Sequence, residues 1–163
     1  KSPAVLNIDA KIRQFIRQLE QTLIHADNPK GVGLSAPQVG KLWRIFSTYL
    51  PAAKPVIHTF INPQIISASK KLTLGPNPKQ PILEGCLSIP RIWGPVLRHS
   101  WIKLKWQMAD GSWQMAKFSG FEARVIQHEL YHLNGILFTD HSLSQNQPLY
   151  QEKRGKLTPF DIL

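Results

Sequence analysis

Apolar residues near the start of the chain recur at intervals of three and four, which places their side chains on one face of a helix. Asp9 precedes them, and its carboxylate can accept a hydrogen bond from a free backbone N–H of the first turn. Residues 27–29, Asp-Asn-Pro, oppose continuation of the helix. We therefore predict a helix from Asp9 to about Ala26 that buries the stripe Ile12, Phe15, Ile16, Leu19 and Leu23.

Four later segments carry the alternating or β-branched and aromatic pattern of strands: residues 43–50, 56–66, 101–107 and 112–118. Pro63 has no N–H to donate to a sheet ladder, so we expect it to interrupt the second segment. Asp110 and Gly111 form a hairpin signal between the last two segments. We assign to packing within this sheet, rather than to base stacking, the tryptophans Trp101, Trp106 and Trp113.

A second helix is predicted after the hairpin. Ser119 and Glu122 match a capping box at its start, and Gly135 is a suitable C′ residue at its end. Residues 31–40 and 75–81 are rich in glycine or proline and are predicted as turns and connectors. The polar tail that follows ends in a short apolar piece, which either docks as an edge strand or remains free.

The composition limits the class of protein. The longest apolar runs fall far short of the roughly 18 residues needed to span a bilayer, so we expect a soluble protein without a membrane partner. We also expect it to be a monomer. The single cysteine, Cys86, cannot form an internal disulfide, which suits a reducing compartment such as the cytoplasm. Twenty basic and ten acidic residues give a net charge of +10, which favours polyanions such as RNA. A generally solvated basic surface explains the charge equally well, because the sequence contains no long basic run.

The strongest chemical signal is His-Glu-x-x-His at His128, Glu129 and His132. Residues four apart lie on one face of a helix, so the two imidazoles can bind a single metal ion. Glu129 lies about 80° around the helix from their mean direction, close enough to reach a water on the ion without binding the ion itself. This is the arrangement of a general base in a metal hydrolase. The alternative is a coincidental surface pattern.

A catalytic site of this kind needs a third protein ligand. A metzincin-like protease would have a third histidine at position 138, which is Phe138 here. A thermolysin-like protease would use a downstream glutamate, and only Glu152 is available, in a tail with weak helix signals. Cys86 remains, in a turn-like segment where its thiolate would be a strong ligand for Fe²⁺ or Zn²⁺. Taken alone, Cys86 is better explained as a small buried apolar residue.

Three ordered segments, GVGLSAPQ, EGCLS and QHELYHLNG, resemble the three motifs of peptide deformylases, and the likeness covers residues 31–140. The resemblance implies an α+β fold in which antiparallel strands wrap around a central helix that carries the H-E-x-x-H pair. It also implies one catalytic domain over residues 1–163, with residues 140–163 as a C-terminal tail. The implied reaction is hydrolysis of the N-formyl group from the formylmethionine of nascent peptides, with release of formate.

The resemblance further implies the site residues. Cys86, His128 and His132 would hold one divalent metal ion, Fe²⁺ in the cell and replaceable by Zn²⁺, Ni²⁺ or Co²⁺. Glu129 would be the general base. The oxyanion would be stabilised by the Gln38 side chain and the Leu87 backbone N–H. The substrate peptide would bind as an added strand, in contact with Val32, Gly33, Gly85 and the pocket residue Val125.

Three positions depart from the family pattern or vary within it. Tyr131 stands where the family usually has aspartate, Ser35 where alanine is common, and Trp93 at a variable position that contacts the carboxyl side of the substrate. All the implied ligands and the base are present, so we expect an active enzyme. Its partners would be N-formylmethionyl peptides and, through the basic surface, ribosomal RNA. The alternatives are an H-E-x-x-H metalloprotease and a weakly active deformylase-like binding protein.

Overall fold

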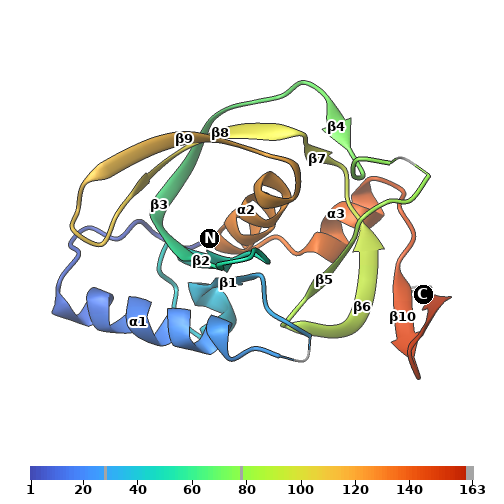
Figure 1. Ribbon diagram of the computed structural model, residues 1–163, viewed down its shortest axis with the longest axis horizontal. Helices are drawn as coiled ribbons and strands as arrows, with labels where there is room; N and C mark the ends of the chain where they lie inside the picture. The colour runs from blue at the N-terminus through green and yellow to red at the C-terminus, as the bar shows by residue number, and fades with distance from the viewer. Residues whose placement is uncertain (28, 78, 161–163) are drawn as a thin grey trace.

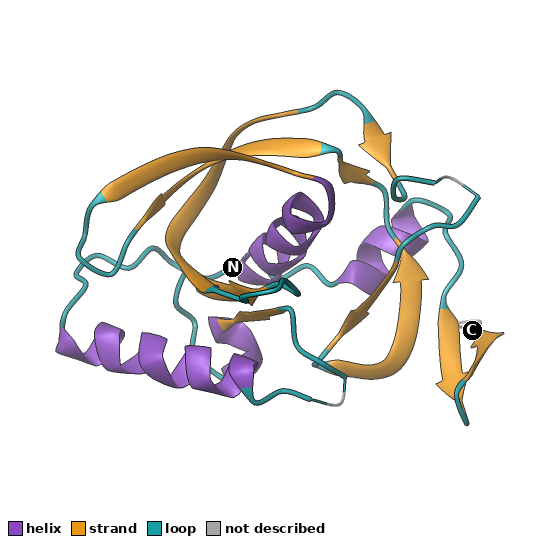
Figure 2. Ribbon diagram, viewed as in Figure 1, coloured by secondary structure: helices purple, strands orange, loops and turns teal. Residues whose placement is uncertain are grey.

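The computed structural model describes residues 1–27, 29–77 and 79–160. Figure 1 shows α2 at the centre of the molecule, with β3, β8 and β9 curving over it, and Figure 2 shows how strands enclose this helix. The expected α+β fold around a central helix is confirmed. The elements are α1 (Ala10–Ile24), β1 (Gly33–Ser35), the 3-10 helix η1 (Ala36–Val39), β2 (Ile45–Tyr49), β3 (Ile57–Ala68), β4 (Leu72–Thr73), β5 (Leu83–Cys86), β6 (Ile89–Pro95), β7 (Arg98–His99), β8 (Trp101–Gln107), β9 (Trp113–Ser119), α2 (Gly120–Leu133), α3 (Phe138–Ser144), β10 (Tyr150–Lys153) and β11 (Lys156–Pro159).

The first helix forms as the sequence predicts. The Asp9 carboxylate accepts a hydrogen bond from the backbone N–H of Ile12 at 2.9 Å, and the predicted apolar stripe is buried. The helix ends at Ile24, two residues before the expected end. Its buried face packs against β1 and β2, in a core cluster that includes Leu34 and Ile45. None of the helices in the described ranges is both long and apolar enough to cross a bilayer.

A five-stranded antiparallel sheet in the order β1-β2-β3-β8-β9 forms the curved wall around α2. The prediction that Pro63 interrupts a strand is wrong, since β3 continues through it. The register with β8 shifts between Ile61 and Gln64, and Asn62 has φ +52°. Pro63 therefore lies in a bulge, where the ladder does not require its missing N–H.

The tryptophans of this sheet divide between its two faces. Trp106 packs against Phe60 and Phe118 on the inner face, as expected of a packing residue. Trp101 and Trp113 lie on the outer face, where lysine side chains cover their rings. The inner face packs on the apolar side of α2, in a cluster that includes Ile102, Leu104, Ile126, Leu130 and Leu133.

The central helix begins differently from the prediction. Ser119 is its N-cap, but the Ser119 side chain makes no capping hydrogen bond, so the capping box is wrong. The chain passes directly from β9 into α2 because Gly120 adopts φ +60° and its N–H donates to Ser100 O at 3.2 Å. The end of the helix is as predicted, with Gly135 at φ +75°.

A second sheet, in the order β11-β10-β6-β5, lies beside α3. Residues 140–160, expected as a tail, contain most of α3 and the β10–β11 hairpin. α3 is fixed to β6 because Ser142 Oγ donates to Pro95 O at 2.9 Å. β11 is an edge strand of this sheet, so the described part of the apolar end docks rather than remaining free. Residues 161–163 of that end lie outside the described ranges.

Candidate metal centre

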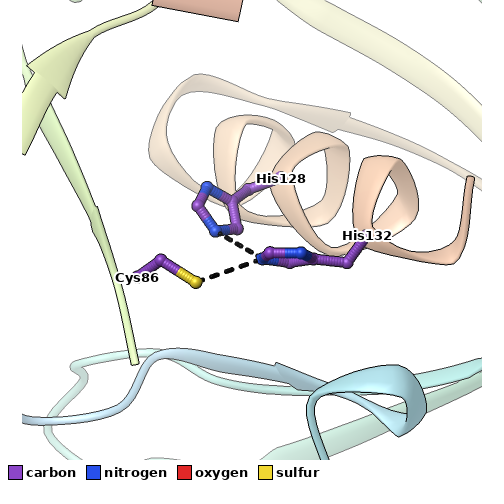
Figure 3. Close-up of side chains that lie close together, drawn as sticks. All are labelled: Cys86, His128 and His132. Atoms are coloured by element: carbon purple, nitrogen blue, oxygen red, sulfur yellow. Dashed lines mark hydrogen bonds between the residues drawn. The ribbon is translucent and has the colours of Figure 1, made fainter. Parts of the chain in front are cut away.

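Three side chains from two elements converge beside α2 (Figure 3). Cys86 comes from the end of β5, and His128 and His132 come from one face of α2. Cys86 Sγ lies 3.2 Å from His132 Nε2, which lies 3.1 Å from His128 Nε2, and all three donor atoms lie within 4.8 Å of one another. The spacing of the histidines places both rings on one side of the helix, as predicted.

The donor set fits a divalent metal ion. Tetrahedral coordination with metal–nitrogen bonds of about 2.0 Å and a metal–sulfur bond of about 2.3 Å separates neighbouring donors by roughly 3.3–3.5 Å. The observed separations of 3.1 and 3.2 Å lie close to that spacing. One thiolate and two imidazoles suit Fe²⁺ or Zn²⁺ and leave a fourth position for water or substrate.

The structure distinguishes between the candidate third ligands. Cys86 is buried beside Phe138 and contributes to the donor cluster. Glu152, the thermolysin-like alternative, lies on β10, where it accepts a hydrogen bond from Trp93 Nε1 at 3.0 Å. The thermolysin-like ligand set is therefore wrong. The Phe138 ring instead stacks on His128, with centroids 5.9 Å apart.

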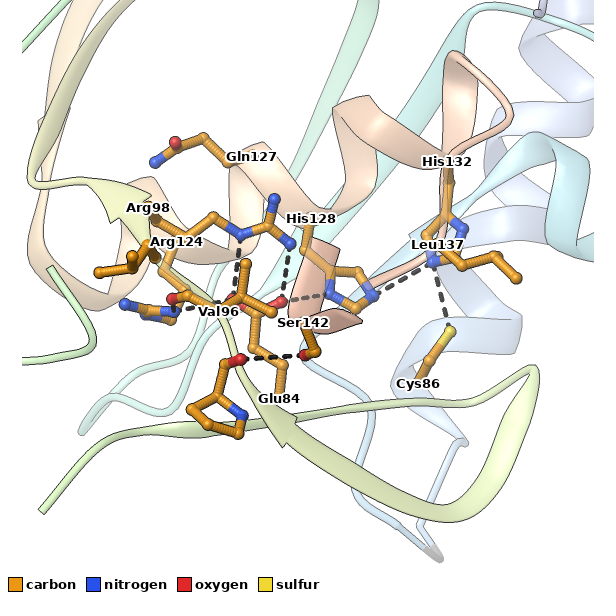
Figure 4. A network of polar contacts seen from close by, with 12 residues as sticks. Glu84, Cys86, Val96, Arg98, Arg124, Gln127, His128, His132, Leu137 and Ser142 are labelled. Carbon is orange, nitrogen blue, oxygen red and sulfur yellow. Dashed lines mark hydrogen bonds and ion pairs between the residues drawn. The ribbon is translucent and has the colours of Figure 1, made fainter. Parts of the chain in front are cut away.

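A buried polar network holds His128 in place (Figure 4). Glu84 Oε2 accepts a hydrogen bond from His128 Nδ1 at 2.9 Å. The same carboxylate accepts bonds from Arg98 Nε and Nη2 at 3.0 and 2.8 Å, and from Arg124 Nη1 at 2.8 Å. Because the proton of His128 is held on Nδ1, Nε2 is free to bind a metal ion. Burial alone would raise the pKa of Glu84, but the charge of Arg98 and the hydrogen bonds of His128 and Arg98 lower it far below its usual value.

The sequence interpretation assigned no role to Glu84, Arg98 or Arg124. Arg124 lies four residues before His128, on the same face of α2, and this spacing is the signal that could have identified it. Arg98 has no local signal, because it comes from β7 and approaches Glu84 only through the tertiary fold.

Of the two histidines, only His128 carries a positive charge near neutral pH. Burial acts to lower the pKa of His128, but its hydrogen bonds with Cys86 and Glu84 outweigh burial and raise that pKa to about 10. Burial and the neighbouring charge of His128 lower the pKa of His132 to about 3. A metal ion bound here therefore replaces a proton.

Glu129 lies next to this cluster and is almost fully buried. Its Oε2 atom has no hydrogen-bond partner within the described residues. Burial raises the pKa of Glu129 to about 7, against the opposing charge of His128. Gly33 lies against the same carboxylate, and a β-carbon there would collide with it. A buried carboxylate with a free oxygen and a pKa near neutrality can accept and return a proton.

The predicted substrate residues line one cavity of about 240 Å³ that also contains Glu129 and the Cys86 and His128 side chains. The lining contains the predicted substrate contacts Val32, Gly33, Gly85 and Val125 and also the predicted oxyanion donors Gln38 and Leu87. The structure thus brings every predicted site residue together.

Two of the three positions that depart from the family pattern or vary within it, Ser35 and Tyr131, contact residues around the metal centre. Gln38 Oε1 accepts hydrogen bonds from the backbone N and the Oγ of Ser35, at 2.8 and 2.7 Å, and Gln38 Nε2 therefore points to Cys86 Sγ at 3.4 Å. Tyr131 lies beside the polar network that holds His128. Its ring centroid lies 4.2 Å from that of His141 and 5.1 Å from Arg98 Cζ.

Comparisons with known proteins agree in family and fold. The family model described as polypeptide deformylase matches residues 1–148. The peptide deformylase of Thermomicrobium roseum is 41% identical over 139 residues, which cover 82% of this chain and 73% of the relative. A crystal structure of a probable peptide deformylase from Synechococcus phage S-SSM7 superposes with a TM-score of 0.76 at 35% identity, over 86% of this chain and 90% of that one. The crystal structure of a peptide deformylase from Synechococcus elongatus in complex with actinonin gives a TM-score of 0.73 at 35% identity, over 94% of this chain and 72% of that one.

Proposed function

Because this chain belongs to the peptide deformylase family, we propose that its Cys86, His128 and His132 bind one divalent cation, which is Fe²⁺ in the cell. The protein is a metal-dependent hydrolase that removes the formyl group from N-formylmethionyl peptides. The main support for this site is that the three donor atoms converge next to Glu129, whose buried Oε2 has no hydrogen-bond partner within the described residues. Zn²⁺, Ni²⁺ and Co²⁺ suit the same donors and would replace Fe²⁺ in the purified protein.

We propose Glu129 as the group that moves the proton. A divalent cation in this site would acidify a water molecule and polarise the formyl carbonyl group. Glu129 takes a proton as the water oxygen attacks the formyl carbon, and returns it to the amine nitrogen as the carbon–nitrogen bond breaks and formate leaves. Its pKa of about 7 suits both transfers at neutral pH.

The negative charge that develops on the formyl oxygen must be stabilised by hydrogen-bond donors. We propose the Gln38 side-chain amide and the backbone N–H of Leu87, because both residues line the cavity that contains Glu129. Ser35 fixes the amide so that Nε2 faces the centre. One such donor is worth about 3 kcal/mol in the transition state.

The substrate peptide would bind as an added strand between the backbone at Val32 and Gly33 and the backbone at Gly85. Its methionine side chain would enter the part of the cavity that Val125 lines. Main-chain hydrogen bonds would then supply affinity for any nascent peptide, and the apolar pocket would supply the preference for methionine.

The decisive experiment measures formate release from formyl-Met-Ala-Ser by protein loaded anaerobically with Fe²⁺ or Ni²⁺. We expect turnover, and we expect Cys86→Ala to lose metal and turnover together, because two ligands remain and the thiolate charge is gone. Unchanged metal content in Cys86→Ala would remove Cys86 from the site. Cleavage of unformylated peptides would support a metalloprotease, and absent turnover at full metal occupancy would support a binding protein.

The outer face of β8 and β9 favours RNA as a second partner. It carries Lys103, Lys105 and Lys117 together with Trp101 and Trp113, and β3, β8 and β9 contain no acidic residue. We propose that a monomer in a reducing compartment approaches ribosomal RNA through this face, since lysines can neutralise phosphates. Lys103→Glu/Lys117→Glu should reduce co-sedimentation with ribosomes at low salt, and unchanged co-sedimentation would exclude this face.

A further inference from the structure

A second cavity, of about 360 Å³, adjoins the cavity that contains Glu129. Residues of β4, β7 and the start of α2 line it, and Ile82, Phe121 and Arg124 line both cavities. Its volume is within the range of small-molecule sites. None of the residues proposed for the metal, the oxyanion or the peptide lines it, so the proposed deformylase site gives it no role.

The lining of this second cavity is basic. Lys71, Arg98 and Arg124 contribute three cationic residues, and the lining contains no acidic residue within the described ranges. Lys71 is exposed, whereas both arginines are almost fully buried. A concave surface that carries one sign of charge beside low-dielectric walls concentrates ions of the opposite sign. The cavity therefore favours anions.

The two buried arginines carry one positive charge more than their partner balances. Arg98 and Arg124 both bind the Glu84 carboxylate, at 2.8 Å each (Figure 4). No other carboxylate of the described residues lies within ion-pair distance of either arginine. Buried charges are normally paired, because desolvation of a lone charge is costly. An anion in the adjoining cavity would balance the remaining charge.

Both guanidinium groups also retain free hydrogen-bond donors. A guanidinium has five N–H groups. Arg124 Nη1 donates to Glu84 Oε1 and Val96 O, and Arg124 Nη2 donates to Thr73 O. Arg124 Nε and Arg98 Nη1 have no acceptor within the described residues, and neither atom is fully buried. These N–H groups are available to an oxyanion.

The backbone around β4 holds the cationic residues together, and Phe121 adds an apolar wall. The Lys71 carbonyl accepts a hydrogen bond from Ser100 N at 3.3 Å. Two residues later, the Thr73 carbonyl accepts the bond from Arg124 at 2.7 Å. Phe121 lines the cavity and is 44% exposed, so its ring can pack against an apolar or aromatic group. The cavity thus combines a cationic part with an apolar side.

We propose that this cavity binds a small phosphorylated molecule, with the phosphate group beside Lys71, Arg98 and Arg124 and the apolar part against Phe121. A phosphate monoester carries a charge of about −1.5 to −2 at pH 7, which matches the unbalanced buried charge together with the Lys71 ammonium. Planar guanidinium groups suit phosphate oxygens because their N–H donors are fixed in a fork. The proposal concerns a site separate from catalysis, and it does not depend on the proposed deformylase activity.

The test measures the binding of phenyl phosphate, inorganic phosphate and formate to metal-loaded protein by isothermal titration calorimetry at constant ionic strength. Inorganic phosphate tests the cationic part alone, and the phenyl ring adds the contact with Phe121. We expect phenyl phosphate to bind about tenfold more tightly than inorganic phosphate, as one apolar contact can provide. Formate, with a single negative charge, should bind more weakly than either.

Two neighbouring lysines provide a matched pair of variants. Lys71→Glu should weaken the binding of phenyl phosphate about tenfold or more, because an attractive charge at the cavity becomes repulsive. Lys70→Glu makes the same change in net charge at a residue that does not line the cavity, and it should leave the affinity within about twofold of the wild type. Both lysines are exposed, so neither substitution removes a buried side chain.

Equal weakening by the two substitutions would show that phosphate responds only to net charge, and would overturn the proposal. Phosphate that binds Lys71→Glu as tightly as the wild type would lie elsewhere, such as on the metal ion, and would also overturn it. Formate that binds as tightly as inorganic phosphate would rule out a site for phosphate. Binding is measured without turnover, so absent formate release from formyl-Met-Ala-Ser would overturn only the proposed function.

Discussion

Glu129 and Tyr131 lie on α2 close to the two histidines, and different surroundings give them different roles. Glu129 lines the cavity, and one of its carboxylate oxygens has no hydrogen-bond partner within the described residues. It is not one of the proposed metal ligands. We therefore expect Glu129→Gln to keep the fold and the metal while lowering kcat about 100-fold or more, because an amide cannot accept the proton. Metal analysis and steady-state kinetics on one preparation test this, and retained turnover would indicate a different base.

Tyr131 touches the polar network through Arg98, whose Cζ lies 5.1 Å from its ring centroid. Arg98 binds Glu84 through Nε and Nη2, so an aspartate at position 131 would offer Arg98 a second carboxylate. We expect Tyr131→Asp to slow the loss of metal during dialysis against a chelator, whereas Tyr131→Phe should change little. Faster metal loss from Tyr131→Asp than from Tyr131→Phe would mean that packing of the ring against His141 matters more than the added charge.

At the scale of the elements, the short strand β1 approaches α2 so closely that Gly33 lies against the Glu129 side chain. A β-carbon on Gly33 would collide with the Glu129 carboxylate. We expect Gly33→Ala to displace Glu129 and to lower kcat about tenfold or more, since a small misplacement of a reacting group is costly. Metal content and the unfolding temperature should stay near those of the wild type, and a variant with full kcat would show that Glu129 has room to move.

The sequence predicts those elements whose signals are local. The stripe of α1, the β8–β9 hairpin and the face of α2 that carries both histidines follow from spacing alone, and the three motifs contain the proposed ligands. The prediction that Pro63 interrupts a strand was wrong because a bulge accommodates this proline, and the bulge depends on pairing with β8. α3 and the β10–β11 hairpin follow a polar pattern, and β6 rather than local propensity holds them in place.

At the scale of the whole molecule, Glu84 joins three elements: β5, which carries it, β7, which carries Arg98, and α2, which carries Arg124 and His128. Glu84→Gln would leave two buried guanidinium groups without a charged partner. We expect it to lower the free energy of unfolding of the metal-free protein by about 3–5 kcal/mol, measured by denaturant titration at pH 7.

The same carboxylate predicts a dependence of stability on pH. The pKa of Glu84 is lower in the folded protein than its ordinary value, since Arg98 and the hydrogen bonds of His128 and Arg98 outweigh the effect of burial. Its contribution is therefore complete above the unfolded pKa of about 4.3 and is lost as the pH falls below it. The difference between the wild type and Glu84→Gln should shrink between about pH 5 and pH 3, and a constant difference would contradict this account.

Cys86 and His132 lie 46 residues apart in the chain, Cys86 on β5 of the four-stranded sheet and His132 on α2. No short segment contains all three donors, so the complete set exists only after the β5–β6 pair has docked on α2. Tight binding of an ion by the three proposed ligands would thus follow this docking. Metal content per polypeptide would consequently set a lower limit on the fraction of a preparation that has reached the native state, because an incompletely folded chain cannot present all three donors.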